Sequence, residues 1–155
     1  MVTMVVPAAL VALAVTWADY RWANEVRAVV TRMEREVIAL GHPTHFFGHW
    51  GFQYYLEEAG ARPLDFLRDR ARPGDYLLVP RNNYLTPGEI DASAASLVGE
   101  YTHSGPGWVQ TVSPSCAAGF YNSEIGPMPY SFGRGDPDLY RVYRADKKMN
   151  FRAEE

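Results

Sequence analysis

Three histidines follow one another closely in the sequence, and two of them have a spacing that can hold a metal ion. His45 and His49 are four residues apart, with His42 just before them. On a helix this spacing places two ligands on one face. The segment from Thr44 to Phe47 instead favours a strand, and the glycines that follow it would break a helix. The sequence therefore predicts no metal site at these residues, and it implies no cofactor.

The turn Gly48-His49-Trp50-Gly51 is a stronger candidate, because it lies between that predicted strand and a predicted helix. In open α/β sheets, ligands gather at the carboxyl ends of the strands. The N-terminus of the following helix also offers N–H groups and the positive end of its dipole to an anion. The ligand-binding residues that we expect around this turn are His49, Trp50, Gln53 and Tyr54. The alternative is a tight turn in which Trp50 packs into the core.

A second set of polar residues follows the apolar run at positions 76–79. Asn82 and Asn83 come just beyond Pro80, at a strand end where binding groups are often found. Arg81 beside them could meet a phosphate. We include both asparagines among the candidate ligand-binding residues, with a solvated loop as the alternative.

No combination of residues predicts catalysis by this chain. The sequence contains no convincing Ser-His-Asp set, Cys-His pair or phosphate-binding loop. Cys116 is the only cysteine, so it cannot form a disulfide within the chain, and we expect it to be a small buried residue. We therefore name no catalytic residue.

The elements that must position these residues follow from the spacing of apolar side chains. Apolar residues from Val26 to Leu40 recur every three or four positions, which predicts an amphipathic helix that ends at Gly41. This helix should continue an earlier apolar segment, so that one helix runs from about Val5 to Leu40. Strands are predicted over 44–47, 62–66, 76–79, 108–112 and 139–144, helices over 52–59 and 90–98, and a long ordered loop over 113–135. The order of these elements indicates a small α/β layered domain with a mixed sheet.

The first eighteen residues contain no charged side chain. A helix needs ~18 to 20 apolar residues to cross a hydrocarbon layer ~30 Å thick. Residues 1–18 are therefore predicted to be a transmembrane helix, followed by a soluble α/β domain over 19–145 and a charged, frayed tail over 146–155. Two alternatives stay open: a signal peptide, although no Lys or Arg precedes Arg21, and a helix buried in the core. The arginines after residue 18 would place the soluble part in the cytoplasm by the positive-inside rule.

The charge and the aromatic content of the chain indicate which kinds of partner it can bind. The 155 residues carry a net charge of −3, with acidic and basic residues interleaved, so the sequence predicts no nucleic-acid surface. Aromatic residues make up 14% of the chain. This content favours packing, and it also suits surfaces that contact sugars or lipid headgroups.

Four segments of the chain are distinctive: ADYRWAN at 18–24, FFGHWGFQYYLE at 46–57, RPGDY at 72–76 and GFYNSEIGPMPY at 119–130. In this order they resemble the soluble C-terminal portion of bacterial membrane glycosyltransferases of family 39, which are similar to protein mannosyltransferases and to the lipid A aminoarabinose transferase. The likeness extends from about Val5 to Arg144. It implies that the apolar helix is the last of many membrane helices in a longer parent.

The resemblance also implies a function. Members of this family transfer a sugar from a polyprenyl-phosphate carrier to an acceptor on the extracytoplasmic side, and their catalytic acidic residues lie in a membrane region that this chain lacks. We therefore expect a non-catalytic accessory domain in the bacterial inner membrane, with its soluble part outside the cytoplasm, against the arginine count. The expected partners are membrane lipid, membrane helices of a parent or partner glycosyltransferase, and a lipid-linked sugar. Tyr121, in the aromatic loop, is expected to contact the acceptor or the carrier.

Two other functions stay open. One is a membrane-anchored module that binds a sugar or a phosphate without an enzymatic parent, and it predicts weaker binding in His49→Ala or Trp50→Ala. The other is a stand-alone soluble enzyme whose first helix belongs to the core, and it predicts activity from the isolated chain without detergent.

Overall fold

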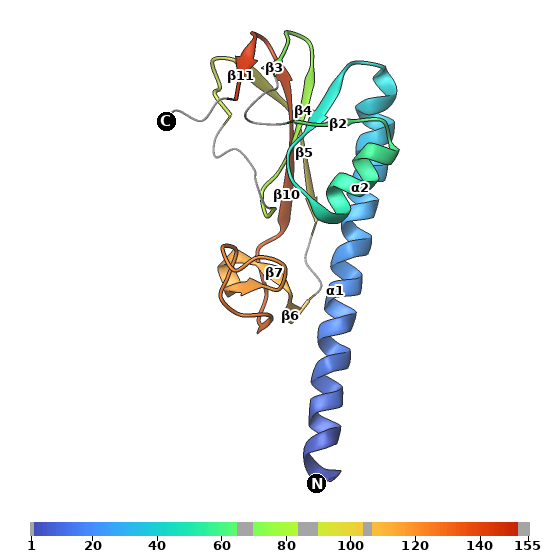
Figure 1. Cartoon of the computed structure of the whole chain (residues 1–155), viewed down its shortest axis with the longest axis vertical. Coiled ribbons are helices and arrows are strands. Elements are labelled where there is room, and N and C mark those ends of the chain that lie inside the picture. The colour runs from blue at the N-terminus through green and yellow to red at the C-terminus, as the bar shows by residue number, and fades with distance from the viewer. Residues whose placement is uncertain (1, 65–69, 84–89, 104–106, 152–155) are drawn as a thin grey trace. The chain divides into compact units, whose positions relative to one another are not determined.

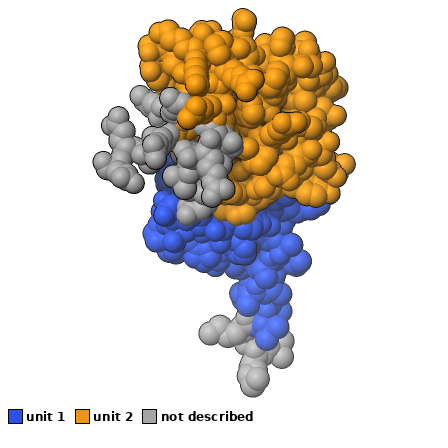
Figure 2. Space-filling view, turned by 45° about the horizontal axis from the view of Figure 1, so that its top comes forward, with its two compact units in different colours: residues 1–25, 103–138 blue, residues 26–102, 139–155 orange. Residues whose placement is uncertain are grey.

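The structure of the protein is a computed structural model that describes residues 2–64, 70–83, 90–103 and 107–151. The chain divides into two compact units (Figure 2). Unit 1 comprises residues 1–25 and 103–138, and unit 2 comprises residues 26–102 and 139–155. Each unit therefore combines two segments that are far apart in the sequence.

One long helix, α1, runs from Val2 to Glu36 (Figure 1). A single 3-10 turn, Ile38–Leu40, follows it, and the chain then leaves the helix at Gly41, whose φ is 79°. Glycine adopts this left-handed conformation without steric cost. The structure thus confirms the predicted continuous helix and its end. Within the part of the chain that the structure describes, no helix combines the length and the apolar character needed to cross a membrane.

Unit 2 is built on a mixed five-stranded sheet with the order β2-β1-β4-β10-β5 (Figure 1). The strands are β1 Thr44–Phe46, β2 Arg62–Pro63, β4 Tyr76–Pro80, β5 Ala95–His103 and β10 Asp138–Ala145. β1 is parallel to both β2 and β4, whereas β10 is antiparallel to β4. Helix α2, Trp50–Glu58, connects β1 to β2, as a parallel pair requires. The predicted α/β class with a mixed sheet is confirmed.

The sheet buries apolar side chains on both faces, because alternate residues of a strand point in opposite directions. One face carries a cluster of buried side chains that consists of Phe47, Leu64, Ala71, Leu77, Val79, Ala95, Ala145 and Met149. On the other face, the ring of Phe46 meets the ring of Phe52 from α2 edge-on, with centroids 6.3 Å apart. The ring of Tyr140 lies 5.3 Å from the same phenylalanine. β4 is therefore the buried central strand that its apolar run predicts.

Unit 1 contains short strand pairs instead of one long loop. β6, Val109–Gln110, pairs with β9, Ser131–Phe132, and β7, Val112–Ser113, pairs with β8, Ala118–Gly119. A 3-10 turn, Pro114–Cys116, joins β7 to β8. The predicted strand over 108–112 is thus two strands, and the predicted loop over 113–135 contains paired backbone. A Cβ atom at Gly126 would collide with the backbone of Ala117 and Ala118, so this segment can pack closely only around glycine.

The helix predicted over 90–98 is wrong, because residues 95–103 form strand β5 beside β10. The cap that we expected at 86–89 lies outside the described residues, as does the end of the predicted strand over 62–66. In unit 2, two further short strands were not predicted: β3, Arg70–Ala71, and β11, Met149–Asn150, which pair with each other. The start of the expected frayed tail is therefore ordered as far as β11, and Met149 is buried in the core cluster.

The pairing of β11 with β3 predicts that the C-terminal segment contributes to stability. Met149→Ala should lower the free energy of unfolding by about 2 kcal/mol, because it removes a buried side chain and leaves a cavity. Lys148→Ala, at an exposed neighbouring position, should change it by less than about 0.5 kcal/mol. Urea denaturation of both variants measures the difference, and equal stabilities would show that the segment is frayed in solution.

Candidate functional site

The residues of the predicted turn site lie where two neighbouring parallel strands end. The turn follows β1, and Asn83 follows β4. The side-chain oxygen Oδ1 of Asn83 accepts a hydrogen bond from the backbone N–H of His49 at 2.9 Å. Its Nδ2 donates to the carbonyl oxygen of the same histidine at 3.2 Å. One asparagine side chain thus holds both backbone groups of His49 and joins the carboxyl ends of the two strands.

This turn is tightly packed. Gly48 has a φ of 97°, and a Cβ atom there would lie 2.9 Å from Cγ of Pro80 and 3.0 Å from Cγ of Asn83. Trp50, the first residue of α2, has a φ of 60°. For a residue other than glycine this conformation costs roughly 1–3 kcal/mol and persists only where the surrounding contacts enforce it. The contacts of Asn83 with His49 are contacts of this kind.

The other predicted side chains of the turn are hydrogen-bonded along α2. Nδ1 of His49 lies 3.0 Å from Oε1 of Gln53, and Nε2 of Gln53 donates to Oε1 of Glu57 at 2.8 Å. The Tyr54 hydroxyl donates to Oε1 of Glu58 at 2.9 Å, and this hydrogen bond raises the pKa of Tyr54. The structure therefore brings His49, Gln53 and Asn83 together, whereas Tyr54 points to a different partner.

Two predicted residues lie apart from this group. Asn82 is half-buried and precedes the asparagine that holds the turn. Tyr121 belongs to unit 1, where its hydroxyl donates to both carboxylate oxygens of Asp19 at 2.8 Å. Burial and this hydrogen bond raise the pKa of Tyr121 to about 12, and its ring stacks on Trp22 with centroids 5.7 Å apart. Tyr121 thus fixes its own loop to helix α1.

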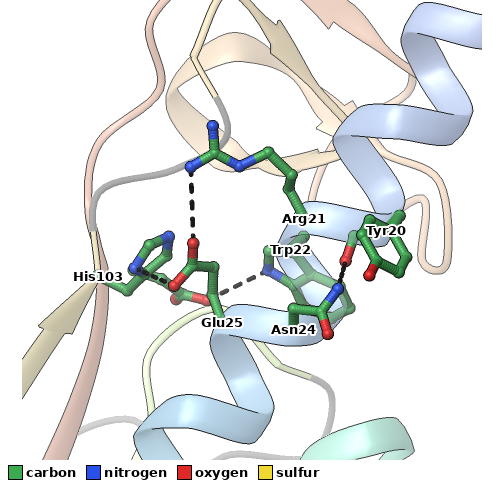
Figure 3. Close-up of polar contacts among 7 residues, drawn as sticks. Tyr20, Arg21, Trp22, Asn24, Glu25 and His103 are labelled. Atoms are coloured by element: carbon green, nitrogen blue, oxygen red, sulfur yellow. Dashed lines mark hydrogen bonds and ion pairs between the residues drawn. The ribbon is translucent and has the colours of Figure 1, made fainter.

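Unit 1 contains a cluster of polar side chains that the sequence did not predict (Figure 3). Nδ1 of His103 lies 3.0 Å from Oε2 of Glu25, and the guanidinium of Arg21 lies 3.7 Å from the other oxygen of that carboxylate. Close by, Nε1 of Trp22 donates to Oδ2 of Asp138 at 3.4 Å. Helix α1 therefore meets the two ends of the segment 103–138 through polar contacts. The sequence carries no signal for them, because the partners are more than 75 residues apart.

The environment of this cluster favours the neutral form of its histidine. Burial lowers the pKa of His103, and the negative charges of Glu25 and Asp138 only partly oppose that effect. Its Nε2 atom is buried and has no hydrogen-bond partner among the described residues. When Nδ1 donates to Glu25, Nε2 is left as a proton acceptor.

Large apolar side chains are exposed throughout unit 1. Along α1, an exposed stripe repeats at alternating spacings of four and three residues: Val6, Leu10, Leu13, Trp17 and Tyr20. In the segment 103–138, the exposed large side chains are Trp108, Phe120, Tyr121, Met128 and Phe132. The rings of Trp108 and Phe132 stack with centroids 5.6 Å apart. We call these two sets the apolar surface of unit 1.

A groove of about 810 Å³ also lies within unit 1. Helix α1 forms one wall with small and apolar side chains such as Ala8, Val11 and Val15, and Phe120 and Tyr130 contribute to the other wall. The lining residues of α1 are spaced by three or four positions, so they share one helix face. Apolar side chains thus face both the groove and the outside of this helix.

No protein-family model matches the chain, and no curated protein or solved structure is significantly similar to it. The resemblance to glycosyltransferase family 39 therefore rests on the four sequence segments alone. What it implies about function stays a prediction.

The lowered pKa of His103 predicts a pH dependence of stability. Its pKa in the folded chain lies below the ordinary value near 6.5 that it regains on unfolding. As the pH falls from 7.5 to 5, the unfolded chain takes up this proton more readily than the folded chain does, so the free energy of unfolding decreases. His103→Asn keeps a donor for Glu25 but cannot titrate, so it should lose less stability over this range.

Urea denaturation at several pH values, followed by tryptophan fluorescence, measures this effect. The three other histidines are common to both proteins, so the difference between the two profiles reports on His103. Parallel profiles would mean that this histidine keeps an ordinary pKa in the folded chain.

Proposed function

We propose that this chain is a membrane-attached, non-catalytic accessory domain of a polytopic glycosyltransferase that takes its sugar from a polyprenyl-phosphate carrier. Its place would be the extracytoplasmic side of the bacterial inner membrane, where it would help to recognise the acceptor or the carrier. The observation that carries the proposal is the apolar surface of unit 1. The sequence segments that resemble family 39 supply the type of enzyme.

The stripe on α1 favours contact with lipid. Leu10 and Leu13 are 62% and 66% exposed, and no charged side chain occurs before Asp19. Trp17 and Tyr20, at the end of the uncharged stretch, are each 60% exposed. Tryptophan and tyrosine are enriched at the boundary between hydrocarbon and water. This order of side chains suits a helix that enters lipid with its N-terminal part and meets the headgroups near residues 17–20.

The second set of exposed side chains supports the same proposal. Trp108 and Phe132 are 64% and 58% exposed, and both come from short loops and strands of unit 1. Their rings stack on each other, and exposed apolar side chains that group together are typical of an interaction site or a membrane contact. Aromatic rings with a polar edge also suit stacking on sugars and contact with headgroups. Recognition of a lipid-linked sugar would use both properties.

The proposal assigns catalysis to the membrane region of the enzyme and names no catalytic residue in this chain. Nε2 of His103 has no hydrogen-bond partner among the described residues. The polar side chains of the turn at His49 bind one another. In the family that the sequence resembles, the catalytic acids belong to the membrane region, so the soluble portion can serve recognition.

Attachment to lipid predicts the effect of charges on the stripe. The double variant Leu10→Asp/Leu13→Asp should lower partitioning into vesicles of phosphatidylethanolamine and phosphatidylglycerol by at least about ten-fold, because two exposed apolar side chains would no longer leave water. The matched control is Leu97→Asp/Val98→Asp, since both positions are 50% exposed in unit 2. Co-sedimentation of the full chain with vesicles measures partitioning. Equal loss in the two double variants would count against the stripe as the attachment surface.

The role in sugar transfer can be tested with a chimera. The chain is fused behind the membrane region of a family 39 enzyme that has lost its own soluble portion, and sugar transfer from a polyprenyl-phosphate sugar is measured. The proposal expects transfer to be restored, and expects it to fall when residues 119–135 are deleted. A chimera that inserts into membranes but transfers no sugar would reject the accessory role while leaving membrane attachment untouched.

A further inference from the structure

A polar pocket of about 630 Å³ lies in unit 2, at the opposite end of the sheet from the predicted turn site. Its wall includes Thr44 and His45 at the start of β1, Arg62 at the start of β2, and Asp75 just before β4. Arg70 and Arg72, in and just after β3, complete it. The pocket therefore lies at the amino ends of parallel strands, whereas the sequence predicts a ligand site at their carboxyl ends.

The charge of this pocket is distinctive. Three arginines line it together with His42 and His45, although acidic residues outnumber basic ones, 18 to 15, in the chain as a whole. Among the residues that the structure describes, none of the three guanidinium groups forms an ion pair. Like charges that face the same cavity repel one another. An anion bound in the cavity would attract all three guanidinium groups and offset their mutual repulsion.

The one carboxylate in the described wall does not neutralise the arginines. Asp75 is 7% exposed, and its Oδ2 accepts the backbone N–H of Arg72 at 2.8 Å. The same oxygen lies 3.6 Å from Nε2 of His45. Asp75 therefore closes the turn before β4 and orients the imidazole, while the guanidinium groups remain available to a ligand.

We propose that this pocket binds a ligand that carries a phosphate monoester or a diphosphate group. A guanidinium presents two parallel N–H groups that match two phosphate oxygens, and three guanidinium groups suit an anion of more than one negative charge. The volume is typical of a site for a small organic molecule, so the phosphate would carry a polar body. The ligand is a soluble phosphate ester or a phosphate headgroup of a lipid, and both share this chemistry.

The arginines predict which variants lose binding. The full chain should bind inorganic pyrophosphate with one site, and its affinity should fall as salt is raised, because the contacts are ionic. Arg62→Ala and Arg72→Ala should each weaken binding by about ten-fold, since each removes a charge-assisted pair of hydrogen bonds. Arg72→Lys should restore only part of the affinity, because an ammonium lacks the planar fork. Isothermal titration calorimetry measures all of these affinities.

Arg81→Ala separates this pocket from the other place where the sequence allows a phosphate to bind, the carboxyl end of β4. Arg81 is exposed and belongs to the same unit, but it follows the carboxyl end of β4. Its loss should leave pyrophosphate binding unchanged. If Arg81→Ala weakens binding while Arg72→Ala does not, the anion binds at the carboxyl end and the proposed pocket is rejected.

A second arm separates the two sources of the ligand. Vesicles of phosphatidylcholine with and without phosphatidic acid are compared for the original chain and for Arg62→Ala/Arg72→Ala, with circular dichroism as the check that the variant is folded. Additional binding to phosphatidic acid that the double variant loses supports a lipid headgroup as the ligand. Binding of pyrophosphate without additional binding to phosphatidic acid supports a soluble phosphate ester as the ligand. The proposal would be overturned if the chain bound neither pyrophosphate nor phosphatidic acid, or if the arginine variants bound them as well as the original chain does. These results do not test the attachment of the α1 stripe to lipid.

Discussion

The change of side-chain chemistry along helix α1 is the constraint on which both units depend. From Val26 to Val37, apolar residues spaced by three and four positions are buried in unit 2. From Val6 to Tyr20, a stripe of the same spacing is exposed in unit 1. The two halves differ in their remaining positions, which are uncharged before Asp19 and largely charged from Glu25 to Glu36, and in whether the apolar stripe is buried. The C-terminal part of the helix is therefore buried in unit 2, and its N-terminal part exposes an apolar face.

Several elements of unit 2 could be predicted from the sequence because their signals are local. The apolar run of β4 and the alternation of β10 are recognisable within a window of a few residues. Strand β5 could not be recognised in this way. Alanines and serines around Ala95 resemble a short helix, and only pairing with β10, about 40 residues later in the sequence, makes a strand there. Strands β3 and β11 have two residues each, so neither has a local pattern.

The candidate sites show the same limit. Sequence reasoning correctly placed the turn at His49 at the end of a strand, but it could not show that Asn83, 34 residues away, holds both backbone groups of that histidine. The arginine pocket was missed for a related reason. Arg62, Arg70 and Arg72 follow no recognised motif, and only the pairing of β2 with β1 and of β3 with β11 places them around one cavity. The general rule that ligands bind at the carboxyl ends of strands predicts a site at the opposite end of the sheet.

The way unit 1 is held together gives its apolar surface a physical meaning. The large side chains of this segment, Trp108, Phe120, Met128 and Phe132, are at least 52% exposed. Polar contacts take the place of a large core: Glu25 with His103, Trp22 with Asp138, and Asp19 with Tyr121. Burial of the exposed aromatic side chains would add a stabilisation that these polar contacts do not supply. Exposed aromatic side chains gain stabilisation when another surface covers them, and for this reason the proposal of membrane attachment rests on unit 1 rather than on the sheet of unit 2.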